Sequence, residues 1–276
     1  MALVAALILM VQSALAQNYR GTPKPTIQDY GPFPEEVKAK LTKNVTKAAP
    51  ATCGNPAGPC LFYGGDFLYD PFYPSIANGL ANDNTTLISG SPYGAAVWVP
   101  FTVPAGQTWQ VRGLFTNNQS DYGVLDQAPT EPTAAAFWSV NEGVEPGIAG
   151  TVIASGTNAA TATPTGRTAF GLIEFTIQVE GLDFVLTPGT YWLTVVPQCT
   201  NVADPYCFET FFVSDVEYIN TKPTNSFGPP EPVDSSFFDS SLFGLSFDPT
   251  NGPLGATGGI GGDAFSAGVL GRIAPN

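Results

Sequence analysis

The stretch Ile173–Glu180, which reads IEFTIQVE, decides the fold class. Ile, Phe, Ile and Val occupy every second position, and Glu, Thr, Gln and Glu fill the positions between them. A period of two places one set of side chains on a buried face and the other set on a wet face. The stretch therefore predicts a β-strand in a half-buried sheet.

Similar runs of β-branched and aromatic residues lie along most of the chain and are separated by turn residues. The runs cover residues 96–103, 107–116, 134–141, 151–155, 182–186, 190–196, 208–214 and 264–270. Turn signals such as Pro104-Ala105-Gly106 and Pro188-Gly189 separate them, and no long helical period competes. We therefore expect an all-β fold, an antiparallel, jelly-roll-like β-sandwich with long loops, as a single domain over residues 61–276.

The composition supports a folded, exported β-protein with an acidic body. Charged residues make up 12% of the chain, against about 25% in an ordinary soluble domain. Residues 61–276 carry twenty acidic and four basic side chains, whereas residues 17–60 carry three acidic and six basic ones. An acidic body repels nucleic acid, so we expect no nucleic-acid partner.

The first sixteen residues predict a signal peptide. An apolar run over residues 2–16 ends in Ala-Leu-Ala, a small-x-small sequence that signal peptidase accepts. No Lys or Arg precedes the run, which leaves a retained anchor as the alternative. No second run of spanning length follows, so we expect a secreted or cell-surface protein without a transmembrane segment in its mature chain.

Residues 17–60 form a Pro- and Lys-rich linker or N-terminal arm. A short helix over residues 34–46 would align Val37, Leu41 and Val45 in a narrow apolar stripe. The basic arm can support self-association by docking on an acidic neighbour, or it can be a solvated leader.

Four cysteines, Cys53, Cys60, Cys199 and Cys207, fit an oxidising compartment. Four cysteines allow three pairings. Turn residues between the members of each close pair favour local disulfides. A zinc site is disfavoured because the chain has no histidine and neither interval has the usual ligand spacing.

Several short segments resemble those of secreted bacterial proteins of uncharacterised function. The segments are LFYGGDF (61–67), NGLAN (78–82), SPYGAAVW (91–98), FTVPAGQTW (101–109), PGTYWL (188–193) and FSAGVLG (265–271). Some proteins of that group carry C-terminal sorting anchors of the PEP type. The resemblance implies a jelly-roll-like sandwich over about residues 61–271 and an exported location, and it implies no catalytic residues.

The absence of histidine removes Ser-His-Asp triads, Cys-His pairs and the usual catalytic zinc sites. A pair of carboxylates remains possible, as in glycoside hydrolysis. Glu174 and Glu180 have the same parity on their strand and would share a face. The simpler explanation is that they are the polar half of an alternating strand, since a chain with 23 acidic residues has same-face pairs by coincidence.

Calcium is the ion that the sequence suits best. Asp66, Asp70 and Asp83 lie in a loop-rich segment that also contains Asn82 and Asn84, and carboxylate and amide oxygens are calcium ligands. Asp and Asn are also ordinary turn residues. We expect no resident cofactor apart from a possible calcium ion.

Aromatic residues in loops offer a ligand platform. Tyr69, Phe72 and Tyr73 belong to YDPFYP, and Tyr93 belongs to SPYG. Exposed loop aromatics often contact ligands, whereas aromatics that cap one end of a sandwich only pack.

These observations favour a secreted, non-catalytic β-sandwich that binds at the cell surface or in the matrix through adhesion or carbohydrate contact. The first alternative is a secreted carbohydrate-active hydrolase that uses a carboxylate pair. The second is a structural subunit of an extracellular assembly.

Overall fold

The computed structural model describes residues 53, 59–67, 79–82, 93–120, 135–169, 172–198, 219–221, 223–224, 228, 236–240, 245–250 and 265–275. Every regular element in this part of the chain is a β-strand, and every strand pair is antiparallel. The expected antiparallel all-β fold is therefore confirmed. The same residues include no helix long and apolar enough to cross a membrane.

Ten strands form one continuous, curled sheet in the order β1-β14-β5-β8-β7-β6-β9-β4-β12-β13. Their bounds, in chain order, are β1 Cys60–Tyr63, β4 Ala96–Val103, β5 Trp109–Ser120, β6 Ala135–Glu142, β7 Thr151–Ala169, β8 Leu172–Leu186, β9 Gly189–Gln198, β12 Phe237–Ser240, β13 Leu245–Pro249 and β14 Ala267–Ile273. Short strands complete the fold: β3 (Gly79–Ala81) and β10 (Ile219–Thr221) extend this sheet beside β5, while β2 (Asp66–Phe67) pairs with β11 (Pro223–Thr224).

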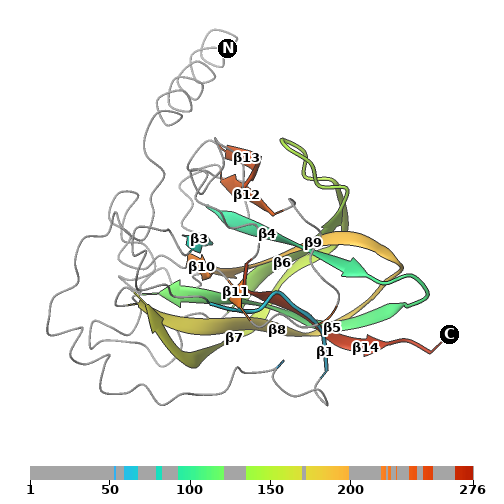
Figure 1. Ribbon diagram of the computed structural model, residues 1–276, viewed down its shortest axis with the longest axis horizontal. Helices are drawn as coiled ribbons and strands as arrows, with labels where there is room; N and C mark the ends of the chain where they lie inside the picture. Colours follow the sequence, from blue (N-terminus) through green and yellow to red (C-terminus); the bar gives the residue numbers. More distant parts are fainter. Residues whose placement is uncertain are drawn as a thin grey trace, which may run out of the picture.

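The curled sheet folds over so that its two halves face one another, which makes the molecule sandwich-like (Figure 1). Strands β1, β14, β5 and β8 form one layer, and β6, β9, β4, β12 and β13 form the other. Strand β7 connects them, since residues 151–159 pair with β6 and residues 160–169 pair with β8.

The main core lies between the two layers. Alternate residues of each strand point into it and are almost fully buried, as period-two alternation requires. Val97, Val99 and Phe101 of β4 face Leu114 of β5 and Ile177 of β8 in this cluster.

The outer faces of both layers are also covered in part. On the outside of the β6-β9-β4 layer, Trp98 and Trp192 pack with Phe237 of β12 and Phe247 of β13. On the outside of the other layer, Tyr63, Phe115 and Leu270 pack beside Cys53 and Cys60. Strand β4 is therefore buried on both faces, which explains its nearly continuous apolar sequence AVWVPFTV.

The predicted strands agree with the observed ones in most places. Residues 96–103 form a strand with the expected bounds, and the expected runs 173–180 and 182–186 form the single strand β8. Gly181, with a φ of 73°, lies at an irregularity where β8 changes its pairing register against β5. Strand β7 is much longer than the predicted run of residues 151–155.

Several expectations fall on residues that the structure does not describe. The signal peptide (1–16), most of the arm (17–60) and the run 208–214 lie outside the described residues. These expectations stay predictions.

Candidate functional site

The cysteines at the start of β1 form the expected local disulfide. Cys53 and Cys60 are bonded, with their Cα atoms 5.3 Å apart. The bond packs on the aromatic cluster of Tyr63 and Phe115 and so attaches the chain before β1 to the sheet. Cys199 and Cys207 lie outside the described residues, so their pairing stays a prediction.

Asp66, the first predicted calcium ligand, lies in a buried hydrogen-bond network. The Tyr63 hydroxyl donates to Asp66 Oδ1 at 2.5 Å, and Asn117 Nδ2 donates to the Tyr63 oxygen at 3.0 Å. Asn117 also donates to Ser266 Oγ at 2.7 Å and accepts from Thr176 Oγ1 at 2.7 Å. These bonds join β1, β5, β8 and the start of β14.

The calcium prediction gains no support from this arrangement. Asp66 is 8% exposed, and one of its carboxylate oxygens already accepts a hydrogen bond from Tyr63. The described residues contain no group of three or more Asp, Glu, Cys or His side chains that could hold a metal ion. Asp70 and Asp83, the other two predicted ligands, lie outside those residues.

Tyr93, one of the four predicted platform aromatics, is buried and not exposed. Its ring packs on Trp98 and Phe137, and its hydroxyl donates to Asp239 Oδ2 at 2.7 Å. Burial raises the pKa of Tyr93, and the nearby charge of Asp239 raises it further. Tyr93 thus anchors β12 to the start of β4, while Tyr69, Phe72 and Tyr73 lie outside the described residues.

The carboxyl group of Asp239 loses part of its hydration where it meets Tyr93. Burial raises the pKa of its carboxyl group, although the hydrogen bond from Tyr93 acts in the opposite direction. The neighbouring charge of Asp248 raises the pKa further.

The two carboxylates weighed for catalysis have different surroundings. Glu174 is fully buried, and the Thr165 hydroxyl donates to its Oε2 at 2.6 Å. Glu180 is exposed and accepts a hydrogen bond from Gln178 at the surface. Because Glu174 of β8 is buried and bonded to Thr165 of β7, its role is to stabilise the contact between these two strands.

A second polar network, which the sequence did not reveal, bridges the two layers inside the core. Asn82 Nδ2 donates to Asn118 Oδ1 at 2.8 Å and to the carbonyl of Val195 in β9 at 2.9 Å. Thr116 Oγ1 donates to the same carbonyl at 2.8 Å, and Asn118 Nδ2 donates to Thr116 Oγ1 at 2.9 Å. Asn82, Thr116 and Asn118 have no exposed surface, so we assign this network to the stability of the fold.

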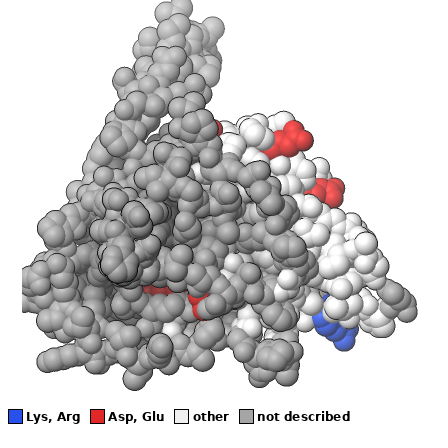
Figure 2. Space-filling model, viewed as in Figure 1, with Lys and Arg blue, Asp and Glu red and all other residues white. Residues whose placement is uncertain are grey.

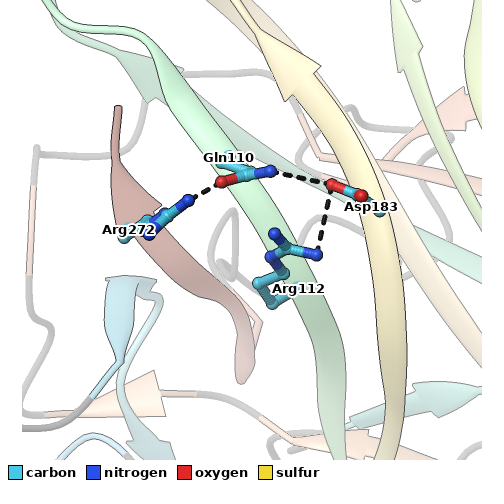
Figure 3. A network of polar contacts seen from close by, with 4 residues as sticks. All are labelled: Gln110, Arg112, Asp183 and Arg272. Carbon is cyan, nitrogen blue, oxygen red and sulfur yellow. Dashed lines mark hydrogen bonds and ion pairs between the residues drawn. The ribbon is translucent and has the colours of Figure 1, made fainter. Parts of the chain in front are cut away.

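An exposed row of polar side chains lies at the opposite end of β5, on the outer face of the β14-β5-β8 sheet (Figure 3). Arg272 Nε donates to Gln110 Oε1 at 2.8 Å, and Gln110 Nε2 donates to Asp183 Oδ1 at 2.9 Å. Arg112 Nη1 lies 3.2 Å from the same Asp183 oxygen. We call Gln110, Arg112, Asp183 and Arg272 the polar row.

The polar row is open to water, since the side chains of Arg112 and Asp183 are 46% and 64% exposed. It contains two of the four basic residues in the acidic stretch 61–276. The part of the molecular surface that is described in Figure 2 carries few charged groups. Its donors and acceptors hold one another in place through the two hydrogen bonds and the ion pair described above.

Sequence reasoning missed the polar row because its members come from three strands. Gln110 and Arg112 precede Asp183 by about seventy residues and Arg272 by 160 or more. The signal that could have pointed to it is the scarcity of basic residues in the body of the chain.

No family model matches this chain, and neither does any curated protein or solved structure. The resemblance to secreted bacterial sandwiches therefore stays a prediction.

Proposed function

We propose that this protein is an exported, non-catalytic β-sandwich that binds a glycan, or another polar component of the cell surface or matrix, through the polar row. The observation that carries the proposal is the arrangement of Gln110, Arg112, Asp183 and Arg272 in Figure 3. Amide, guanidinium and carboxylate groups are donors and acceptors that sugar hydroxyls can satisfy.

Three features support this assignment. First, the row lies on the strands β5, β8 and β14 of the sheet and not on loops, beside the positions where their pairing registers shift. Second, the side chains are linked to one another, which lowers the entropy lost when a ligand binds. Third, each of the four side chains can still bond to a ligand, because a guanidinium has five N–H groups, a carboxylate has about four acceptor sites, and an amide has two N–H groups and two acceptor sites.

A hydrolase is less well supported by the same contacts. Glu174, one member of the carboxylate pair considered, is fully buried and bonded to Thr165. A general acid or nucleophile must reach the glycosidic bond, which a carboxylate without exposed surface does not do in this conformation. Binding is therefore the function that we propose.

The proposal is tested by a retention screen of the purified protein on a glycan array and on insoluble polysaccharides, with and without calcium. Wild-type protein should be retained by at least one polysaccharide. Arg112→Ala and Gln110→Ala should each lower the retention by about tenfold, the effect of one lost hydrogen bond to a charged group or of two neutral ones.

Gln178→Ala is the matched control. Gln178 is an amide on β8 that bonds to Glu180 and is not a member of the polar row. Its loss should leave retention unchanged. Retention that survives both polar-row substitutions would exclude the polar row as the binding surface. Retention that requires calcium would instead favour a calcium site that includes Asp66, Asp70 or Asp83.

A further inference from the structure

An exposed aliphatic side chain lies beside the polar row. Val185 of β8 is 53% exposed. It is directly opposite Gln110 in the antiparallel pair of β5 and β8, and Arg272 of β14 is directly opposite Gln110 on the other side. Side chains opposite one another project from the same face of a sheet, with Cβ atoms about 4.5–5.5 Å apart. Val185 therefore adds an apolar contact to the outer face that carries the polar row.

Val185 shares this face with the ion pair as well. Asp183 precedes Val185 by two residues, so both side chains leave β8 on the same side, whereas Phe184 between them packs against the core. Arg112 reaches Asp183 from β5, next to Gln110 (Figure 3). We call the polar row together with Val185 the β5–β8 patch.

Donors exceed acceptors in the β5–β8 patch. Arg272 bonds to Gln110 through Nε, and Arg112 contacts Asp183 through Nη1. A guanidinium has five N–H groups and no acceptor, so both arginines keep further donors for a ligand. Asp183 Oδ1, in contrast, already meets both Gln110 and Arg112. The β5–β8 patch therefore suits a ligand that is rich in acceptors.

Charge limits the kind of acceptor. The chain has a net charge of −13, which disfavours a polyanionic ligand even though the β5–β8 patch contains two arginines and one aspartate. A neutral acceptor avoids this repulsion. A carbonyl oxygen is neutral and only accepts, whereas a hydroxyl group donates as often as it accepts. The carbonyl oxygen is therefore the better match to unused guanidinium donors.

Val185 adds a requirement for an apolar group next to that carbonyl. A ligand methyl group placed against Val185 removes apolar surface of both groups from water, which is favourable. The acetamido group of an N-acetylated sugar combines a neutral carbonyl oxygen, an N–H group and a methyl group in one small unit. The oxygen suits the arginines, the N–H group suits Asp183, and the methyl group suits Val185.

We infer that the β5–β8 patch recognises the acetamido group of an N-acetylhexosamine in a neutral polysaccharide. This inference rests on the proposed glycan binding and names the class of glycan. Val185 is the residue that distinguishes an acetamido group from a hydroxyl group, because a hydroxyl has no methyl group to place against it.

The test is the retention of the purified protein on chitin and on cellulose. These two polysaccharides share the same backbone linkage, and chitin carries an acetamido group where cellulose carries a hydroxyl group. Wild-type protein should be retained by chitin at least about tenfold more strongly, as expected for a hydrogen bond to a charged group. Arg112→Ala should lower the retention on chitin by about tenfold.

Val185→Thr tests the apolar contact by exchanging one methyl group for a hydroxyl in a side chain of the same shape. It should lower the retention on chitin by about fourfold, the factor that corresponds to one buried methyl group. Val152→Thr is the matched control, since Val152 lies on β7 outside the β5–β8 patch and is 54% exposed. It should leave retention unchanged, and both variants should melt at the wild-type temperature because both positions are exposed.

The outcomes separate this inference from the proposed function. Equal retention on chitin and cellulose, or stronger retention on a glycan without acetamido groups, overturns the inference; if Arg112→Ala still abolishes that retention, the proposed glycan binding stands. Chitin retention that Val185→Thr leaves unchanged, or that Val152→Thr lowers equally, also overturns the inference. A protein that no polysaccharide retains overturns both.

Discussion

Strand β5 carries polar side chains at both of its ends, and the two ends use them in different ways. At one end, Thr116, Asn117 and Asn118 are buried and bonded to β1, β9 and the start of β14. At the other end, Gln110 and Arg112 lie in the exposed polar row. Polar side chains thus hold the fold together at the end of β5 where water is excluded, and they are open to water at the other end.

This difference has a physical cause. A buried amide that loses its partner keeps the full cost of its lost hydration, whereas an exposed amide bonds to water instead. We therefore expect the buried end to control stability and the exposed end to control binding.

The largest effect is expected for the matched amides of β5. Asn118→Ala should lower the free energy of unfolding by about 3 kcal/mol, because it leaves a cavity and removes the partners of Asn82 and Thr116. Gln110→Ala should change it by less than about 0.5 kcal/mol. Urea unfolding followed by tryptophan fluorescence measures both, and equal effects would refute the comparison.

A smaller effect is expected for two threonines of β7. Thr165→Val removes the hydroxyl that donates to the buried Glu174, so the free energy of unfolding should fall by about 2 kcal/mol. Thr163 is exposed, and Thr163→Val should change stability by less than about 0.5 kcal/mol. If the two variants unfold at the same urea concentration, Glu174 does not depend on Thr165.

The third prediction concerns the partly buried carboxyl of Asp239. Its pKa is raised in the folded protein, so the folded state holds the proton more tightly than the unfolded state and loses stability as the pH rises above about 4. Asp239→Asn keeps an acceptor for Tyr93 but cannot ionise. Relative to wild type, its melting temperature should rise by about 2–4 °C between pH 4 and pH 7. A difference that stays constant across this range would contradict the assignment.

The smallest effect on stability is expected for Arg112→Ala. The ion pair of Arg112 with Asp183 is exposed, and such pairs contribute about 0–1 kcal/mol. Thermal unfolding at low and high salt should place the melting temperature of the variant within about 4 °C of wild type. A loss of about 8 °C or more would show that the polar row supports the fold.

The sequence alone predicts the strands well but not the surroundings of their polar faces. Alternation in residues 173–180 correctly places Phe175, Ile177 and Val179 in the core. It also predicts a wet Glu174, which is instead fully buried. Parity assigns a side chain to one face of a strand, and whether that face meets water depends on segments that are distant in the sequence.

The candidate site was less accessible to prediction for the same reason. The polar row exists because the register between β14, β5 and β8 brings Arg272, Gln110 and Asp183 side by side. Register depends on the pairing of whole strands and leaves no local signal. Tyr93, by contrast, has the local sequence of an exposed turn residue and is covered by Asp239 and Phe137 from remote strands.

The most direct test of the account is the retention of wild-type, Gln110→Ala and Gln178→Ala proteins on the same polysaccharide. We predict that Gln110→Ala weakens retention by about tenfold while its melting temperature stays within about 1 °C of wild type, and that Gln178→Ala behaves as wild type. Equal retention of all three proteins would contradict the claim that the exposed end of β5 is the binding surface.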